Sequence, residues 1–184
     1  NPLLDSILTR KYEEAARQGV SVYFDLCDLR DFPLSGVDMV TVLANLLDNA
    51  ICAAAQAYPP EVYVRVRKTE EEYLLSVRNR VQRDVELPPD GQLPRTTRKE
   101  PGHGMGLSNV RDVLLRHGAE YTLSCRDNWF RFTCAVPTDN ARHLNRQNMT
   151  IFVQQKRNSA ILWSVKEAFR ADMVMLRWGG TSPL

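Results

Sequence analysis

The segment from residue 37 to residue 57 constrains the fold more than any other part of the chain. It has the periodicity of one long helix, starts at a capping box of Ser35 and Asp38, and contains no Lys, Arg or Glu. Its polar side chains fall within an arc of about 100° around the helix axis. They are Asp38, Thr41, Asn45, Asp48, Asn49, Cys52 and Gln56. Because a surface helix normally carries Lys, Glu and Arg on its outer face, this polar stripe is expected to face a polar ligand instead of bulk water.

Asn45 and Asn49 lie one turn apart in this stripe. Amide oxygens suit Mg²⁺, which prefers oxygen ligands, keeps several waters and is held in addition by substrate phosphates. The alternative is that both amides hydrogen-bond to neighbouring backbone within a packed core. The pair alone does not decide between a metal site and a structural role.

Three alternate glycines stand immediately before another helical segment, in the run Gly102-His103-Gly104-Met105-Gly106-Leu107. Glycine lets backbone N–H groups approach an anion closely, and a helix N-terminus carries about half a positive charge. The run therefore indicates phosphate binding, although a hinge or a plain turn gives the same pattern. The chain has no G-x-x-x-x-G-K-[ST] motif, and the glycines follow a long loop instead of a strand, which excludes a P-loop and a dinucleotide-binding turn.

The order of helical and strand-like segments predicts the fold class. We expect helices over 3–18, 35–57 and 106–117, strands over 20–25, 62–66, 73–77, 121–125 and 130–136, and a long loop between the third strand and the third helix. This order is typical of an α+β fold built as a two-layer sandwich, with helices on one face of a mixed, mostly antiparallel sheet.

Length and charge divide the 184 residues into a domain and an appendage. Residues 1–138 carry 17 basic and 19 acidic side chains, whereas residues 139–184 carry 7 and 3. Nucleic-acid binding would therefore rest on the basic C-terminal extension alone, and we expect none. A helix is predicted within this extension, over 158–178. No apolar run approaches the roughly 18 residues of a membrane span, and the four cysteines have the spacing of reduced thiols.

Three segments together carry a family resemblance: LANLLDNA at 43–50, VRN at 77–79 and GHGMGLSNV at 102–110. They resemble the N box and the two glycine boxes of the catalytic ATP-binding domain of sensor histidine kinases, in the GHKL superfamily. The start, NPLLDSILTRK at 1–11, is similar to the NP-x-x-D-x-IL-x-x-K segment of the quorum-sensing and citrate-sensor-like subfamily. The resemblance covers about residues 1–137.

The resemblance implies a Bergerat-type ATP-binding fold that binds ATP and Mg²⁺. By position, Asn49 is the implied Mg²⁺ ligand, Asn45 is implied beside the phosphates as the catalytic amide, and Asn79 is implied to face adenine. A lid at about 79–105 would close over the nucleotide. The further residues implied to bind ATP are Arg98, Lys99, Gly102, His103, Gly104, Met105, Gly106 and Leu107.

The resemblance also implies the reaction. ATP-hydrolysing members of the superfamily place a Glu general base where this chain has Asn45, and an amide cannot take that proton, so hydrolysis is disfavoured. We expect phosphoryl transfer instead, to a histidine on a dimerisation hairpin outside this chain. His103, His117 and His143 lack the setting of that acceptor, so the chain alone should bind Mg-ATP without phosphorylating itself. The implied partners are the hairpin and a response regulator. The parent kinase is expected to be a homodimer. This chain would be its cytoplasmic domain, and other segments would anchor the protein to the membrane.

Two alternatives stay open. One is an anti-sigma-type serine kinase of the same superfamily. The other is a degenerate nucleotide-binding signalling module without kinase activity. It is favoured by Thr41 and Cys52, where related kinases often have Glu, and by the lack of a recognisable phenylalanine-bearing lid box.

Overall fold

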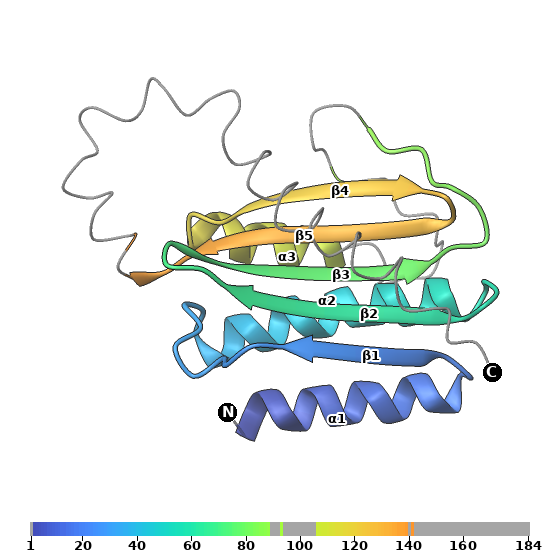
Figure 1. Cartoon of the computed structure of the whole chain (residues 1–184), viewed down its shortest axis with the longest axis horizontal. Coiled ribbons are helices and arrows are strands. Elements are labelled where there is room, and N and C mark those ends of the chain that lie inside the picture. Colours follow the sequence, from blue (N-terminus) through green and yellow to red (C-terminus); the bar gives the residue numbers. More distant parts are fainter. Residues whose placement is uncertain (1, 89–92, 94–105, 140, 142–184) are drawn as a thin grey trace, which may run out of the picture. The chain divides into compact units, whose positions relative to one another are not determined.

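The computed structural model describes residues 2–88, 93, 106–139 and 141. Within them the elements follow in the predicted order (Figure 1). The helices are α1 (Pro2–Arg17), α2 (Gly36–Ala54) and α3 (Gly106–Arg116), and the strands are β1 (Ser21–Leu26), β2 (Glu61–Lys68), β3 (Glu72–Arg80), β4 (Glu120–Arg126) and β5 (Trp129–Pro137). All but residues 139 and 141 of the predicted extension at 139–184 lie outside the described residues, so that prediction stays untested.

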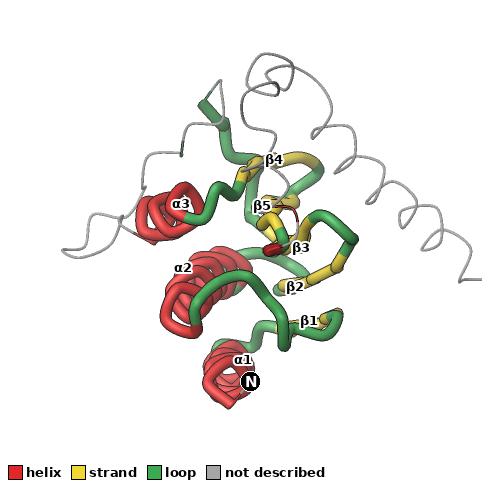
Figure 2. Tube along the Cα trace, turned by 90° about the vertical axis from the view of Figure 1, so that its left-hand side faces the viewer, coloured by secondary structure: helices red, strands yellow, loops and turns green. Residues whose placement is uncertain are grey.

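The strands form one sheet in the order β1-β2-β3-β5-β4. β1 and β2 are parallel, because α2 connects them and returns the chain to the end of the sheet at which β1 began, whereas all other neighbours are antiparallel. Figure 2 shows α1, α2 and α3 side by side on one face of this sheet. The predicted two-layer α+β sandwich with a mixed, mostly antiparallel sheet is therefore confirmed.

The core lies between the helices and the sheet. Alternate residues of β2, namely Val62, Val64 and Val66, are buried against the helices, and Leu47 and Ile51 of α2 pack over them as part of the same cluster. α2 is long and apolar enough to cross a membrane by length and composition. The same composition suits a helix at the centre of a core, and that is where α2 lies.

Local signals explain where most helices begin and end. Ser35 caps α2 by accepting a hydrogen bond from the backbone N–H of Asp38 at 3.1 Å. Gly19 ends α1 in the left-handed region, at φ +71°. The prediction for the end of α2 was wrong by three residues, because residues 55–57 turn instead of continuing the helix, with the N–H of Ala57 bonded to the carbonyl of Ala54 at 2.9 Å.

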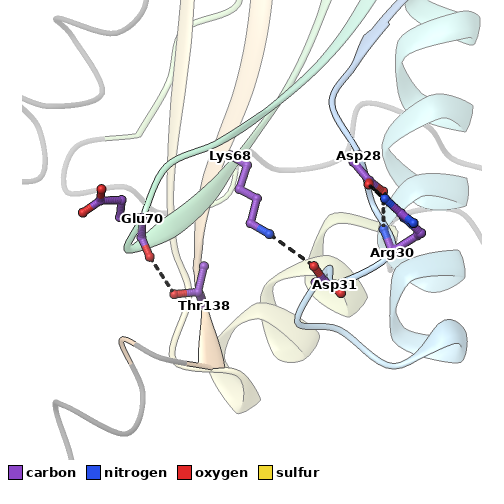
Figure 3. Close-up of polar contacts among 6 residues, drawn as sticks. All are labelled: Asp28, Arg30, Asp31, Lys68, Glu70 and Thr138. Atoms are coloured by element: carbon purple, nitrogen blue, oxygen red, sulfur yellow. Dashed lines mark hydrogen bonds and ion pairs between the residues drawn. The ribbon is translucent and has the colours of Figure 1, made fainter.

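Polar contacts hold the loops at one end of the sheet (Figure 3). Asp31, in the loop between β1 and α2, lies 3.4 Å from Nζ of Lys68 at the end of β2. Thr138, just after β5, donates its hydroxyl to the carbonyl of Glu70 at 3.1 Å. The chain leaving the last strand is thereby tied to the turn between β2 and β3.

Candidate functional site

The polar stripe of α2 meets the first turn of α3. A Cβ atom built on Gly106, the first residue of α3, would lie 3.1 Å from Oδ1 of Asn45 and 3.4 Å from Nδ2 of Asn49. Both carboxamides therefore converge on a position where only glycine leaves their present placement undisturbed. The sequence places them 57 to 61 residues apart from Gly106, and the fold brings all three together.

The two amides differ in what they already bind. Asn45 donates Nδ2 to the carbonyl of Thr41 on its own helix at 2.7 Å, which leaves Oδ1 on the side of Gly106. Asn49 is exposed, and among the described residues its side chain has no hydrogen-bond partner. The alternative that the sequence left open, a hydrogen bond to neighbouring backbone, is therefore found for Nδ2 of Asn45. The carboxamide of Asn49 is available to a ligand.

The N-terminus of α3 adds positive potential at the same place. The first backbone N–H groups of a helix have no partner within the helix, and the helix dipole places about half a positive charge there. α3 begins at Gly106, and its first turn contains no acidic side chain that would offset this potential. Together with two neutral amides, the arrangement favours an anion that carries several acceptor oxygens.

The opposite ends of α2 and α3 are joined by ionic contacts. Asp38, in the first turn of α2, accepts from the side chain of Arg116 at 3.0 Å and lies 2.8 Å from Nε2 of His117. Hydrogen bonding from His117, aided by Ser35 and the charge of Arg116, lowers the pKa of Asp38 below its ordinary value. These contacts fix the position of α3 along α2, and therefore the position of Gly106 against the amides.

A second ionic contact joins α1 to α2. Lys11 of α1 is only 6% exposed, and its ammonium group contacts the carboxylates of Asp48 and Glu14. Burial lowers the pKa of Lys11, but the hydrogen bonds and charges of Asp48 and Glu14 outweigh it and leave the pKa above its ordinary value. Asp48, a member of the predicted polar stripe, is therefore occupied by a neighbouring helix.

Asn79 lies inside β3 and not after it, which corrects the predicted start of the lid. It pairs in register with Val62 of β2 and Phe130 of β5, and the strand continues to Arg80 because pairing continues to Trp129. Its side chain is buried at 3% exposure and donates Nδ2 to the carbonyl of Arg80 at 2.9 Å. It shares the helix-covered side of the sheet with Val77, so the predicted contact with adenine stays a prediction.

The first part of the predicted lid is anchored to the β4–β5 hairpin. The N–H of Val81 donates to the carbonyl of Asn128 at 3.0 Å, and Asp84 accepts from the N–H of Asn128 at 2.8 Å. The N–H of Val85 donates to the sulfur of Cys125 at 3.2 Å. A predicted lid over about 79–105 thus begins as a segment held along the β4 edge of the sheet.

The remaining predicted ATP-binding residues lie outside the described residues. They are Arg98, Lys99, Gly102, His103, Gly104 and Met105. Gly106 and Leu107 are described and stand at the start of α3. Among the described residues no group of three His, Cys, Asp or Glu side chains could hold a metal.

Comparisons with known proteins identify the family and the fold. A family model described as a GHKL domain matches residues 34–137. The nucleotide-free catalytic domain of histidine kinase ThkA superposes with a TM-score of 0.60 at 20% identity, over 75% of this chain and 91% of that chain. Histidine kinase AdeS of Acinetobacter baumannii gives 0.58 at 16%, over 76% of this chain and 64% of that one. The mycobacterial sensor histidine kinase MprB gives 0.53 at 20%, over 74% and 93%. No curated protein matches the sequence.

Proposed function

Because the chain belongs to the GHKL domain family, we propose that it is the ATP-binding catalytic domain of a sensor histidine kinase, of the quorum-sensing and citrate-sensor-like type. The observation that carries this proposal is the convergence of Asn45 and Asn49 on Gly106 at the N-terminus of α3. The likeness in fold to ThkA, AdeS and MprB, all histidine kinases, supports the reaction class.

The residues of the site fit Mg²⁺ bound together with a triphosphate. The oxygen of an exposed carboxamide is a neutral ligand of the kind that Mg²⁺ accepts, and phosphate oxygens and waters would supply the other positions. In this proposal Asn49 holds the metal, and the helix N-terminus at Gly106 binds phosphate oxygens. The bound metal would neutralise charge on the phosphates.

Asn45 bears on whether the bound ATP is hydrolysed or donates its γ-phosphoryl group. Its carboxamide oxygen faces Gly106, where it can orient a water or a phosphate-bound group, but it cannot take a proton from water. Transfer of the γ-phosphoryl group needs positioning and charge neutralisation more than a base on this helix. We therefore expect transfer to a histidine brought by another element, and little hydrolysis.

The partners follow from the same proposal. The acceptor histidine would lie on a dimerisation hairpin of the parent kinase, which would act as a homodimer and pass the phosphoryl group to a response regulator. The domain would lie in the cytoplasm, with membrane anchoring by other segments. Residues 1–138 would form the catalytic domain, and residues 139–184 would be an accessory extension.

One observation favours a second candidate, a nucleotide-binding signalling module without kinase activity. Thr41, one turn before Asn45, donates its hydroxyl to the carbonyl of Val37 at 2.9 Å, so the position where related kinases often have Glu offers no carboxylate. Phosphate transfer to the parent kinase's hairpin, measured with radiolabelled ATP, separates the candidates. Labelling of the hairpin histidine supports the kinase, and its absence while nucleotide still binds supports the module.

Nucleotide binding itself is tested by calorimetry on the full chain, with a non-hydrolysable ATP analogue and Mg²⁺. Asn49→Ala should weaken binding by about tenfold, or about 1.4 kcal/mol, because a metal ligand is lost. Gln18→Ala is the control, since it removes an exposed carboxamide just after α1 and outside the polar stripe of α2, and it should leave affinity unchanged. Equal affinity of Asn49→Ala and wild type would overturn the proposed site.

A further inference from the structure

The face of the sheet opposite the helices carries a row of arginines and aromatic rings. Alternate residues of each strand point to this face, since their neighbours in the strand are buried against the helices. The aromatic and charged residues on it are Tyr23, Asp25, Glu61, Tyr63, Arg65, Arg67, Glu72, Arg78, Arg80, Glu120, Arg126, Trp129 and Arg131. α1, α2 and α3 all lie on the other side (Figure 2).

Five of these residues stack on one another across four strands. The rings of Tyr23 and Tyr63 are stacked with centroids 4.6 Å apart. The guanidinium of Arg78 lies over the rings of Tyr63 and Trp129, with its Cζ at 4.3 and 4.7 Å from their centroids. Arg80 lies over Trp129 at 4.1 Å. We call Tyr23, Tyr63, Arg78, Trp129 and Arg80 the arginine ladder, and its contacts hold both guanidinium groups in fixed orientations.

The hydrogen-bonding edges of these guanidinium groups are not satisfied within the described residues. The side chain of Arg78 has no hydrogen bond or ion pair there, although it is half-buried. Nε of Arg80 is buried without a hydrogen-bond partner, and it forms only a long ion pair with Glu61, whose carboxylate oxygen is 3.8 Å away. Burial lowers the pKa of Arg78, and the charges of Arg131 and Arg65 lower it further. An added carboxylate would relieve the repulsion at Arg78 and accept hydrogen bonds from its guanidinium group.

Not all arginines of the face are available in this way. Arg65 and Arg67 both bind the carboxylate of Asp25, at 3.0 and 2.5 Å, and these contacts lower the pKa of Asp25. Arg78 and Arg80, the two guanidinium groups of the arginine ladder, therefore lack a close carboxylate acceptor within the described residues, and they stand two residues apart on one strand. Side chains at this spacing lie about 7 Å apart on the same face, which equals the spacing of alternate residues in an extended peptide.

We propose that the arginine ladder binds an acidic segment of a protein partner, with carboxylates paired to Arg78 and Arg80. A nucleic acid fits less well. Single-stranded nucleic acids bind sheets by stacking bases on free aromatic rings. Here the rings of Tyr63 and Trp129 are already covered by the guanidinium group of Arg78. They also contact each other edge to face, with centroids 5.7 Å apart. The inference is independent of the nucleotide site, which lies on the helix-covered side of the sheet.

The test uses the full chain and a fluorescein-labelled ten-residue peptide of alternating Glu and Ser, titrated by fluorescence anisotropy at low salt. The double variant Arg78→Gln/Arg80→Gln should bind about tenfold more weakly or worse, because two charge-assisted contacts are lost. The double variant Arg10→Gln/Arg17→Gln removes the same charge from the exposed side of α1 and should change affinity by no more than about twofold. Equal losses in both variants, or no binding by wild type, would overturn the proposal.

Two further arms complete the design. Arg78→Lys/Arg80→Lys keeps the charge but lacks the planar fork, so it should lose several-fold in affinity, and wild-type affinity would contradict recognition by the fork. A labelled ten-nucleotide oligo(dT) should bind more weakly than the peptide. If the oligonucleotide binds more tightly than the peptide and this binding is lost in Arg78→Gln/Arg80→Gln, the face is a nucleic-acid surface instead. Circular dichroism of every variant establishes that it is folded. Nucleotide affinity should be unchanged in all of them, so failure here leaves the proposed kinase site untouched.

Discussion

Nε2 of His117 lies 2.8 Å from Oδ2 of Asp38, which joins the residue after α3 to the first turn of α2. Ser35 Oγ lies 3.0 Å from the same Asp38 oxygen, so one carboxylate serves both the helix cap and the contact between helices. The register of α3 along α2, which sets Gly106 against Asn45, depends on this contact.

Asp38→Asn should lower the free energy of unfolding by about 1 kcal/mol at pH 7, because the charge-assisted contacts with His117 and Arg116 are lost. The folded-state pKa of Asp38 lies below its ordinary value of 3.8. Its contribution is therefore full above about pH 4 and is lost as the pH falls through the folded-state pKa. Urea unfolding of wild type and variant at pH 7, 5 and 3 should give a difference that shrinks at pH 3.

Asp31→Asn provides the control for this experiment. Asp31 is 82% exposed and lies 3.4 Å from Lys68, so its replacement should leave stability nearly unchanged at all three pH values. A loss for Asp38→Asn that is the same at pH 7 and pH 3 would show that shape, and not charge, carries the effect.

Cys134 should be inert toward thiol reagents in the folded chain. All four cysteines are free, but only Cys134 is fully buried, and burial raises its pKa to about 12. The thiolate is the reactive form, so at pH 8 almost none is present at this position. Titration with Ellman's reagent should label Cys134 only after unfolding in guanidinium. A Cys134→Ala variant should give the same native labelling as wild type, and a lower value would contradict this assignment.

The element order and sheet type could be predicted because each segment carries its own periodicity. The ends of elements could not, since they depend on distant partners. β3 extends to Arg80 because Trp129 of β5 continues to pair with it, and nothing in the local sequence of β3 indicates this. α2 ends at Ala54, although Ala55, Gln56 and Ala57 are all residues that a helix accepts.

The amides of the candidate site could be predicted from their unusual place in a helix without Lys, Glu or Arg. Which side chains of the polar stripe face the site and which bind neighbouring helices could not be predicted. Asp48 faces Lys11 and Asp38 faces His117, at separations of 37 and 79 residues. One signal was present for the first pair: Lys11 is a charged residue on the buried stripe of α1, between Ile7 and Ala15, where only a partner makes burial of an ammonium group tolerable.

The contact between Lys11 and Asp48 predicts that its two halves respond differently to mutation. Lys11→Met replaces a buried ammonium group with an apolar side chain of similar length, and the exposed carboxylates of Asp48 and Glu14 can be hydrated. Stability should change by less than about 1 kcal/mol. Asp48→Asn leaves the buried ammonium group with Glu14 alone and should cost about 1 to 3 kcal/mol.

Urea unfolding of the two single variants and the double variant at pH 7 measures this difference. The double variant should be close to Lys11→Met, because Asp48→Asn costs nothing further once the ammonium group is gone. If Lys11→Met is the more damaging change, the pair is a net source of stability and the desolvation argument is wrong.

Gly106→Ala should separate binding from stability. Alanine is the better helix former by about 1 kcal/mol, which favours the variant, but its Cβ would meet Oδ1 of Asn45 at 3.1 Å and Nδ2 of Asn49 at 3.4 Å. The side chains can yield by a small rotation, so unfolding free energy should stay within about 1 kcal/mol of wild type. The rotated amides no longer face the helix N-terminus together, so affinity for the ATP analogue with Mg²⁺ should fall by about tenfold.

Gly19→Ala is the reciprocal control. At φ +71° an alanine is strained, although no atom lies near its Cβ, so the free energy of unfolding should fall by about 1 kcal/mol while nucleotide affinity stays unchanged. Calorimetry and urea unfolding on both variants measure the two effects, and a Gly106→Ala chain that binds nucleotide as wild type does would show that the convergence of the amides on α3 is not the binding geometry.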